Sequence, residues 1–195
     1  MIPVPGLLKA SDSLLLIVDV QERLAPHVHE HERVIENCEW LIGVAEVVGV
    51  PVLATEHHPQ GIGQMVSRLR RRFPEDAILP KEHFSCVSEP SCSSRIEETG
   101  RRQIVVAGME AHVCVMQSAI DLQSSGKSVF IVADAVSSRA PANVECAVQR
   151  MRRHGIEIVT GEMVLFEWAH RGATEQFRQL HRRFLKTPTG GAGQR

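Results

Sequence analysis

Short runs of Val, Ile and Leu alternate along this chain with longer segments in which apolar residues recur every three or four positions. The continuous apolar runs predict strands over residues 14–18, 50–54, 103–107, 129–133 and 156–159. The amphipathic segments predict helices over residues 28–48, 113–125, 142–154 and 174–185, with an arginine-rich helix around 64–73. Regular alternation of this kind is typical of a parallel sheet covered by helices on both faces. We therefore predict an α/β fold, a three-layer α/β/α sandwich with a mostly parallel, Rossmann-like sheet.

The alternation continues without a linker or an internal repeat, so a single domain is expected over residues 1–185. The segment from Glu56 to Glu98 is less regular than the rest of the chain. Residues 186–195 are rich in glycine and polar side chains, and they are predicted to form a disordered tail.

Composition narrows the class of protein. Of the 195 residues, 22 are Lys or Arg and 23 are Asp or Glu, which gives a net charge of −1, and aromatic residues make up only 4%. Nucleic acids and membrane surfaces attract a clustered excess of positive charge, so neither is expected as a partner. The sequence begins without the basic and apolar regions of a signal peptide, and its five cysteines form no CxxC pair. We expect a soluble, cytoplasmic protein with free thiols.

Functional groups of parallel sheets gather at the carboxyl ends of the strands. Polar side chains at predicted strand ends are Asp19, Thr55, Glu56 and Asp134. Gly108 ends another strand and leads into a loop that carries Cys114. A thiol in the first turn of a helix lies in the positive field of the helix dipole, which favours the thiolate. Packing alone is an alternative reading of Cys114, because free cysteines are among the most buried residues.

Two charged residues complement this thiol. Asp19 has the chemistry of a general base, and Lys81 is one of only four lysines in a chain with 18 arginines. An ammonium near the other two groups would stabilise the thiolate and hold the carboxylate ionised. A surface lysine and a turn-forming aspartate are the simpler explanations, and spacing alone does not decide between them.

Three ordered blocks of sequence carry further information. They are Leu16-Ile17-Val18-Asp19-Val20-Gln21, then Pro80-Lys81 followed by His83-Phe84-Ser85, and then Gly108-x-Glu110-Ala111-His112-Val113-Cys114-Val115; residues 134–139 and 162–167 fit as well. From Ser13 to about Leu185 the chain resembles the isochorismatase-like cysteine hydrolases, which include nicotinamidases and N-carbamoylsarcosine amidohydrolases. Among their subgroups it is most similar to the isochorismatase-domain and YcaC-like hydrolases.

The resemblance implies a catalytic triad of Asp19, Lys81 and Cys114, with Cys114 as the nucleophile and Asp19 as its base. It also implies a cis peptide bond between Met109 and Glu110, in a loop whose Glu110 and Cys114 N–H groups bind an oxyanion. The implied reaction is attack on an amide-type carbon–nitrogen bond of a small molecule, followed by hydrolysis of a Cys thioester. A homo-oligomer is expected from the same resemblance.

The substrate pocket and the metal content are less defined by the sequence. Gln21, Phe84 and His112 are candidate pocket residues. Nicotinamidases carry an Asp-x-His pair and a later histidine as metal ligands; here Glu56 and His58 are weak candidates, and no His follows before His83. We therefore expect no metal and no cofactor.

Two other functions stay open. One is a catalytically idle relative of these enzymes that acts as a binding or scaffold protein, and the other is a metal-dependent nicotinamidase. The reactivity of Cys114 separates the first from a hydrolase, while metal content and ammonia release from nicotinamide identify the second. The sequence does not identify the substrate.

Overall fold

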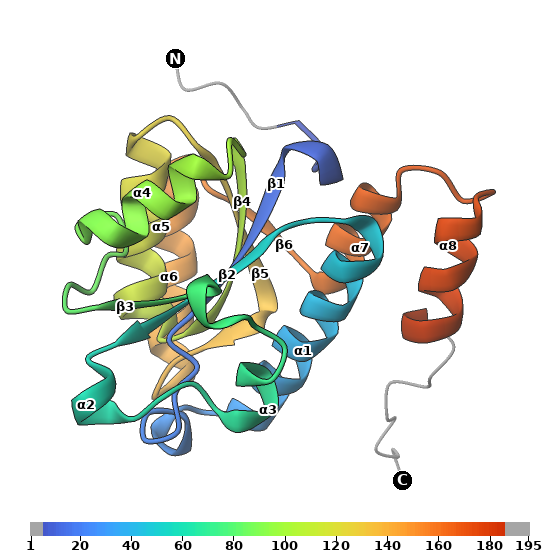
Figure 1. Cartoon of the computed structure of the whole chain (residues 1–195). Coiled ribbons are helices and arrows are strands. Elements are labelled where there is room, and N and C mark those ends of the chain that lie inside the picture. The colour runs from blue at the N-terminus through green and yellow to red at the C-terminus, as the bar shows by residue number, and fades with distance from the viewer. Residues whose placement is uncertain (1–5, 186–195) are drawn as a thin grey trace, which may run out of the picture.

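A computed structural model describes residues 6–185 of the chain. Six parallel strands form one sheet in the order β3-β2-β1-β4-β5-β6 (Figure 1). Their bounds are β1 Ser13–Val18, β2 Val52–His57, β3 Ile78–Lys81, β4 Gln103–Met109, β5 Ser128–Ser137 and β6 Glu157–Val159. This order is that of the doubly wound, Rossmann-like sheets, so the predicted α/β fold is confirmed.

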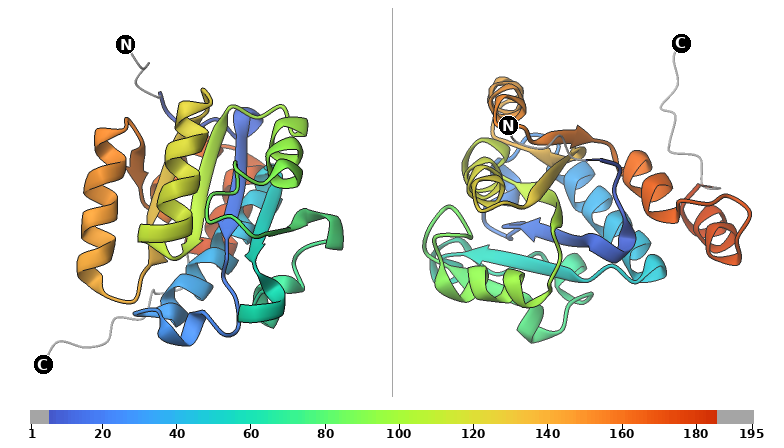
Figure 2. Two further views of the ribbon diagram at one scale, coloured as in Figure 1. Left: turned by 90° about the vertical axis from the view of Figure 1, so that its left-hand side faces the viewer. Right: turned by 90° about the horizontal axis from the view of Figure 1, so that it is seen from above.

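Helices cover both faces of the sheet (Figures 1 and 2). On one face lie α1 (His31–Val48) and α7 (Gly161–Ala169), with α8 (Glu175–Leu180) outside them. On the other lie α4 (Pro90–Glu98), α5 (Met116–Ser124) and α6 (Pro141–Arg153). The short helices α2 (Pro59–Ile62) and α3 (Ser67–Arg70) connect β2 to β3. None of the helices among residues 6–185 is long and apolar enough to span a bilayer.

The strands are buried on both sides, which explains their continuous apolar runs. Every residue of β1 is buried, and successive side chains point to opposite faces. Leu15 and Ile17 belong to the apolar cluster beneath α1 and α7, whereas Leu14 and Leu16 belong to the cluster beneath α4, α5 and α6. The sheet thus separates two cores.

Several predicted boundaries are wrong. Helix α1 begins at His31 rather than at residue 28, because a 3-10 turn (Ala25–His27) precedes it. The arginine-rich helix is reduced to the single turn of α3, since Pro74 follows closely and only Leu69 is buried in it. The last predicted helix changes from α-helical to a π-helical turn at His181. The predicted tail, 186–195, lies outside the described residues.

The strand-end position predicted for Asp134 is also wrong. Strand β5 continues to Ser137, and its pairing with β4 is irregular between Val106 and Gly108. Asp134 lies in this irregular stretch, and its carboxylate accepts a hydrogen bond from the Gly161 N–H at the start of α7. It therefore faces the α7 side and is not at the carboxyl edge of the sheet.

Candidate active site

The carboxyl ends of β1 and β4 form the topological switch point of the sheet. These two strands are neighbours, with Val18 opposite Gly108, and the strands added beyond them extend in opposite directions. In open α/β sheets a crevice for ligands lies at this point. Asp19 follows β1 directly, and the loop to Cys114 leaves β4 there. Gly108 has a φ of 124°, and a Cβ at this position would be only 2.1 Å from the Val18 carbonyl oxygen, so glycine allows this close approach.

Lys81 reaches the switch point from two strands away. It is the last residue of β3, and β2 lies between β3 and β1. The backbones of β3 and β1 are therefore about 10 Å apart, a distance that a long side chain is needed to span. Lys81 Nζ lies 2.7 Å from Asp19 Oδ2, and neither side chain is exposed. The ammonium also donates to the carbonyl oxygens of His83 and Phe84, each at 3.1 Å.

The Asp19 carboxylate is held from both sides. Its Oδ1 accepts a hydrogen bond of 2.6 Å from the Thr55 hydroxyl on β2, while Oδ2 accepts from Lys81. The backbone of Asp19 is left-handed, with φ 50°, a conformation in which aspartate is enriched among non-glycine residues. Both oxygens of this buried carboxylate thus have a hydrogen-bond donor, as buried polar groups require.

Cys114 lies in a π-helical turn, Ala111–Val115, that precedes α5, so the helix predicted from residue 113 begins later. Its side chain is nearly buried, and its thiol interacts with both Asp19 and Lys81. Burial raises the thiol pKa, the Asp19 charge raises it further, and Lys81 opposes both effects. The resting form is therefore the thiol, whereas the helix-dipole argument favoured the thiolate.

Lys81 remains charged in this environment. Burial lowers its pKa, but the charge of Asp19 and the hydrogen bond to Asp19 outweigh that effect, so the pKa is raised above its usual value. The structure thus brings the three predicted triad residues together as one cluster: an ammonium, a carboxylate and a protonated thiol.

The peptide bond between Met109 and Glu110 is cis, at the position that the resemblance implied. The Glu110 side chain is buried and accepts a hydrogen bond of 2.9 Å from Arg139 Nε. The backbone carbonyl oxygen of Glu110 accepts hydrogen bonds from the N–H groups of Val113 and Val115, which fixes the π-helical turn. The role of the Glu110 and Cys114 N–H groups as an oxyanion site stays a prediction.

The three candidate pocket residues differ in their surroundings. Gln21 is fully buried, and its amide donates to the carbonyl oxygens of His57 and Gly63 and accepts from the His57 N–H. It braces the loops around the site, so its donors are not free for a substrate. Phe84 is half-exposed, and the centroid of its ring lies 5.1 Å from the centroid of the His57 ring. The ring of His112 contacts the Ser138 hydroxyl at 2.9 Å.

His57 is a residue of this region that the sequence reasoning missed. It is the register partner of Lys81, one strand nearer to Asp19. Its Nδ1 atom is buried without a hydrogen-bond partner among the described residues, which is uncommon because buried polar groups are nearly always paired. Burial and the nearby Lys81 charge lower its pKa, so the ring is neutral at pH 7. Its position directly after the strand-end residues Thr55 and Glu56 was the available signal.

The two weak metal candidates have other partners. Glu56 is buried, and its Oε1 accepts from the Met65 N–H at 2.6 Å and from Arg70 at 2.7 Å. His58 is half-exposed and pairs with Glu82 at 3.1 Å. Within residues 6–185, no three His, Cys, Asp or Glu side chains are grouped so that they could hold a metal.

Comparison with solved structures agrees with the fold. The MAR1 ribonuclease of Caenorhabditis elegans superimposes with a TM-score of 0.86 and 28% sequence identity over 96% of each chain. The YcaC protein of Escherichia coli, an octameric hydrolase of unknown specificity, gives a TM-score of 0.86 at 23% identity, covering 92% of this chain and 91% of that one. At 23% identity, the likeness to YcaC concerns the fold alone.

Comparison with known sequences identifies the family. The isochorismatase domain matches residues 13–163. Isochorismatase domain-containing protein 1 of Danio rerio is 33% identical over 90% of this chain, which spans 62% of the length of that relative. Isochorismatase domain-containing protein 2 of Danio rerio is 30% identical over 96% of this chain and 94% of that protein. With a domain match over most of its length and a relative aligned almost from end to end, this chain belongs to the isochorismatase family.

Proposed function

We propose that this protein is a cysteine hydrolase that cleaves an amide-type carbon–nitrogen bond of a small molecule. The observation that carries the proposal is the fully buried Lys81–Asp19 pair, 2.7 Å apart, at the switch point of the sheet, where both charges shift the pKa of the Cys114 thiol. A carboxylate beside a thiol is a base beside a nucleophile, the arrangement that covalent catalysis needs.

The resting protonation states define the order of the chemical steps. Because Cys114 rests as a thiol, its proton passes to the Asp19 carboxylate as the sulfur attacks the carbonyl carbon. The tetrahedral intermediate then collapses, the carbon–nitrogen bond breaks, and Asp19 returns the proton to the leaving nitrogen. Water attacks the resulting thioester, which releases a carboxylic acid and restores the thiol. Lys81 keeps its charge throughout and holds Asp19 in place.

The surroundings of the thiol favour a small, uncharged polar substrate. The neutral His57 ring places close to Lys81 a buried nitrogen that has no hydrogen-bond partner within residues 6–185. A half-exposed aromatic ring, Phe84, packs against that histidine and offers an apolar wall. A planar amide group matches both, since it hydrogen-bonds through its edge and stacks through its face.

The pH dependence of alkylation tests whether the cluster is assembled. We expect iodoacetamide to modify Cys114 slowly at pH 7, with a rate that rises well above the usual thiol pKa of about 8.5, because burial and Asp19 raise the Cys114 pKa. Asp19→Asn is expected to lower the midpoint pH of Cys114 alkylation, since it removes a negative charge. Lys81→Met is expected to raise that midpoint, since it removes a positive charge. Peptide mass spectrometry at each pH gives the rates.

Cys146, which is exposed, serves as the internal reference for an ordinary thiol in the same samples. Circular dichroism establishes that each variant is folded before its rates are compared. A wild-type midpoint at or below that of Cys146, or shifts of the same sign in both variants, would contradict the arrangement of charges.

Activity is tested with a panel of small primary amides, nicotinamide included, by measuring ammonia release with and without added zinc, manganese or iron. Turnover of an amide without metal supports the proposal. Turnover of nicotinamide only with metal would support the nicotinamidase alternative, and no turnover together with an unreactive Cys114 would support a binding protein.

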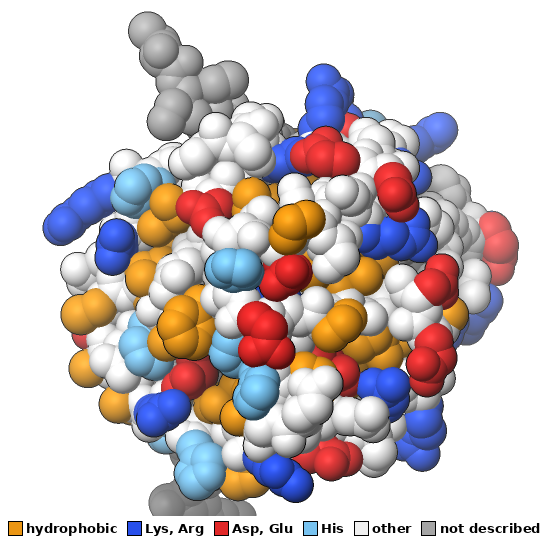
Figure 3. Space-filling model, turned by 60° about the vertical axis from the view of Figure 1, so that its left-hand side comes forward, with side chains coloured by type: hydrophobic (Ala, Val, Ile, Leu, Met, Phe, Trp, Pro, Cys, Tyr) orange, Lys and Arg blue, Asp and Glu red, His pale blue; other side chains and the backbone are white. Residues whose placement is uncertain are grey.

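RNA belongs in the same panel because one structural relative is the MAR1 ribonuclease. We do not propose RNA cleavage, because the net charge of the chain is −1 and, on the face shown in Figure 3, basic side chains are spread among acidic ones.

A homo-oligomer is part of the proposal. The YcaC relative is an octamer, and large apolar side chains of this chain are half-exposed at Phe84, Met163 and Phe166. Size-exclusion chromatography with light scattering tests it, and the mass of a single chain would contradict it. A cytoplasmic location is likewise proposed from the cysteine usage.

A further inference from the structure

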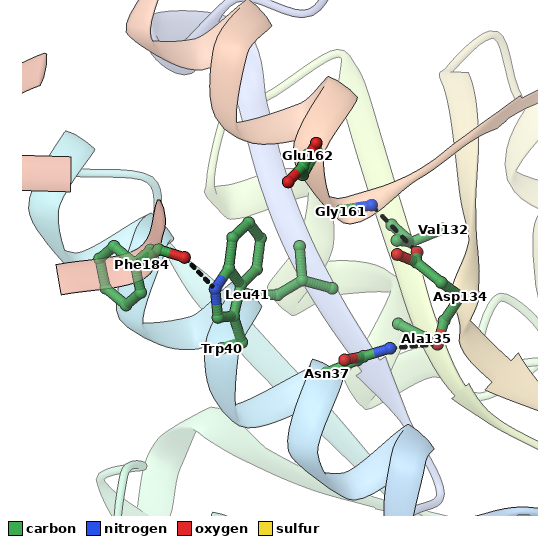
Figure 4. A pocket seen from close by; sticks show the side chains of 9 residues that line it. All are labelled: Asn37, Trp40, Leu41, Val132, Asp134, Ala135, Gly161, Glu162 and Phe184. Atoms are coloured by element: carbon green, nitrogen blue, oxygen red, sulfur yellow. Dashed lines mark hydrogen bonds between the residues drawn. The ribbon is translucent and has the colours of Figure 1, made fainter. Parts of the chain in front are cut away.

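A cavity of about 120 Å³ lies on the side of the sheet covered by α1 and α7 (Figure 4). Its walls are Asn37, Trp40, Leu41, Val132, Asp134, Ala135, Gly161, Glu162 and Phe184. Leu41 and Val132 belong to the apolar cluster beneath α1, whereas Cys114 belongs to the cluster on the opposite face. The cavity is therefore separate from the candidate active site.

The lack of a side chain at Gly161 keeps this cavity open. A Cβ at this position would lie 3.2 Å from the Trp40 ring and 3.6 Å from Asp134 Oδ2. The indole and the carboxylate therefore both approach the first turn of α7, and the space between them stays open. Figure 4 shows the Glu162 side chain at the same turn, above the indole.

Three hydrogen-bond donors of the lining already have acceptors within the chain. Trp40 Nε1 donates to the Phe184 carbonyl oxygen at 3.4 Å, Asn37 Nδ2 donates to the Asp134 carbonyl oxygen at 2.5 Å, and the Gly161 N–H donates to Asp134 Oδ1 at 3.0 Å. None of these bonds uses Asp134 Oδ2 or the carboxylate of Glu162. Among residues 6–185, the charged atoms of the lining that remain unpaired are thus carboxylate oxygens, which accept hydrogen bonds and carry negative charge.

Two arginines of the described residues lie near the cavity, Arg33 and Arg183, and both have other partners. Arg33 donates to the Asp134 carbonyl oxygen and pairs with Glu30 at 2.8 Å. The Arg183 guanidinium lies 5.1 Å from the centroid of the Phe184 ring, so this aromatic ring already has a cation against it. Neither arginine lines the cavity.

We propose that this cavity binds a small primary alkylammonium ion. The ammonium would donate to Asp134 Oδ2 and Glu162, while the indole of Trp40 contributes its ring face to the cation. The alkyl part would contact Leu41, Val132 and Ala135. A volume of about 120 Å³ suits a ligand of a few carbon atoms.

The two tryptophans of the chain provide the experiment. In a ¹H–¹⁵N spectrum of the labelled protein, the indole signals are those of Trp40 and Trp168, and Trp40→Phe assigns them. Trp168 is buried and donates to the Ser13 hydroxyl, outside the cavity lining, so it serves as an internal control. Isobutylammonium chloride is titrated at pH 7 and constant ionic strength, with isobutanol as the uncharged probe of similar shape.

The expected result is a saturable shift of the Trp40 signal with isobutylammonium, while the Trp168 signal stays in place. Isobutanol is expected to bind the wild-type protein at least tenfold more weakly than isobutylammonium does. Isobutylammonium is also expected to bind at least tenfold more weakly to Glu162→Gln, in which the changed residue is exposed. Gly161→Ala should block the cavity. Any of three results overturns the proposal: equal affinity for isobutylammonium and isobutanol, equal affinity of the wild type and Glu162→Gln for isobutylammonium, or no saturable shift of the Trp40 signal up to 100 mM amine.

Discussion

Cys114→Ser is expected to lower amide hydrolysis at least about a thousandfold, because a hydroxyl in place of the thiol is a far weaker nucleophile beside the same base. The side chain changes by one atom, and its neighbours Asp19 and Lys81 stay paired. Stability should therefore change little, since the substitution leaves no appreciable cavity. Initial rates of ammonia release on the best amide of the panel, measured with thermal unfolding on the same samples, give both values.

Cys146→Ser is the matched control, because it makes the same chemical change at an exposed position on α6. It should leave the rate unchanged. Rapid mixing of the wild-type protein with substrate, followed by acid quenching, should also trap an acyl group on the Cys114 peptide. Hydrolysis retained in Cys114→Ser, or an acyl group found elsewhere, would exclude Cys114 as the nucleophile.

Continuous apolarity identified the sheet because the buried strands are covered on both faces. It also located Asp19 and the loop to Cys114, since a strand that ends in a polar residue marks the functional edge of a parallel sheet. The same rule was wrong for Asp134, because the pairing of β5 with β4 is irregular where the apolar run ends. A bulge of this kind leaves no distinct pattern in a run of Val, Ile and Ala.

Lys81 could be placed in the site only through the resemblance. Its strand, β3, is four residues long and contains a proline, so it carries too few alternating positions to be predicted. The order of the strands is a property of long-range packing, and it decides that β3 lies two places from β1. Without that order, the span between Lys81 and Asp19 cannot be derived.

Helix α4 was missed for a related reason. It buries only Cys92 and Ile96, one turn apart, so its amphipathic pattern is short. The segment from Glu56 to Glu98 therefore read as irregular, although it contains His57 and Phe84, both of which lie beside Lys81. The part of the site that we propose to contact a substrate was thus the part with the weakest sequence pattern.

Lys81→Met is expected to destabilise the protein by about 3–5 kcal/mol, because it leaves the Asp19 carboxylate buried without its ammonium partner. Both side chains of the pair have no exposed surface, so solvent cannot replace the lost partner. Asp19→Asn should be destabilising as well, since it leaves the ammonium without its carboxylate. Free energies of unfolding from urea titrations at pH 7 give the two values.

The double variant Asp19→Asn with Lys81→Met completes a double-mutant cycle, which measures the coupling between the two charges. We expect it to be more stable than Lys81→Met alone, because the uncompensated charge is gone and a methionine stem fills most of the lysine volume. Arg178→Met, which breaks the exposed pair with Glu175, is the control and should change stability little. The raised Lys81 pKa means that the contribution of this lysine persists through neutral pH and is lost only as the pH rises through that raised value. Single variants whose effects simply add in the double variant would show that the two charges are not coupled, and the proposed triad would then lack the interaction that holds its base in place.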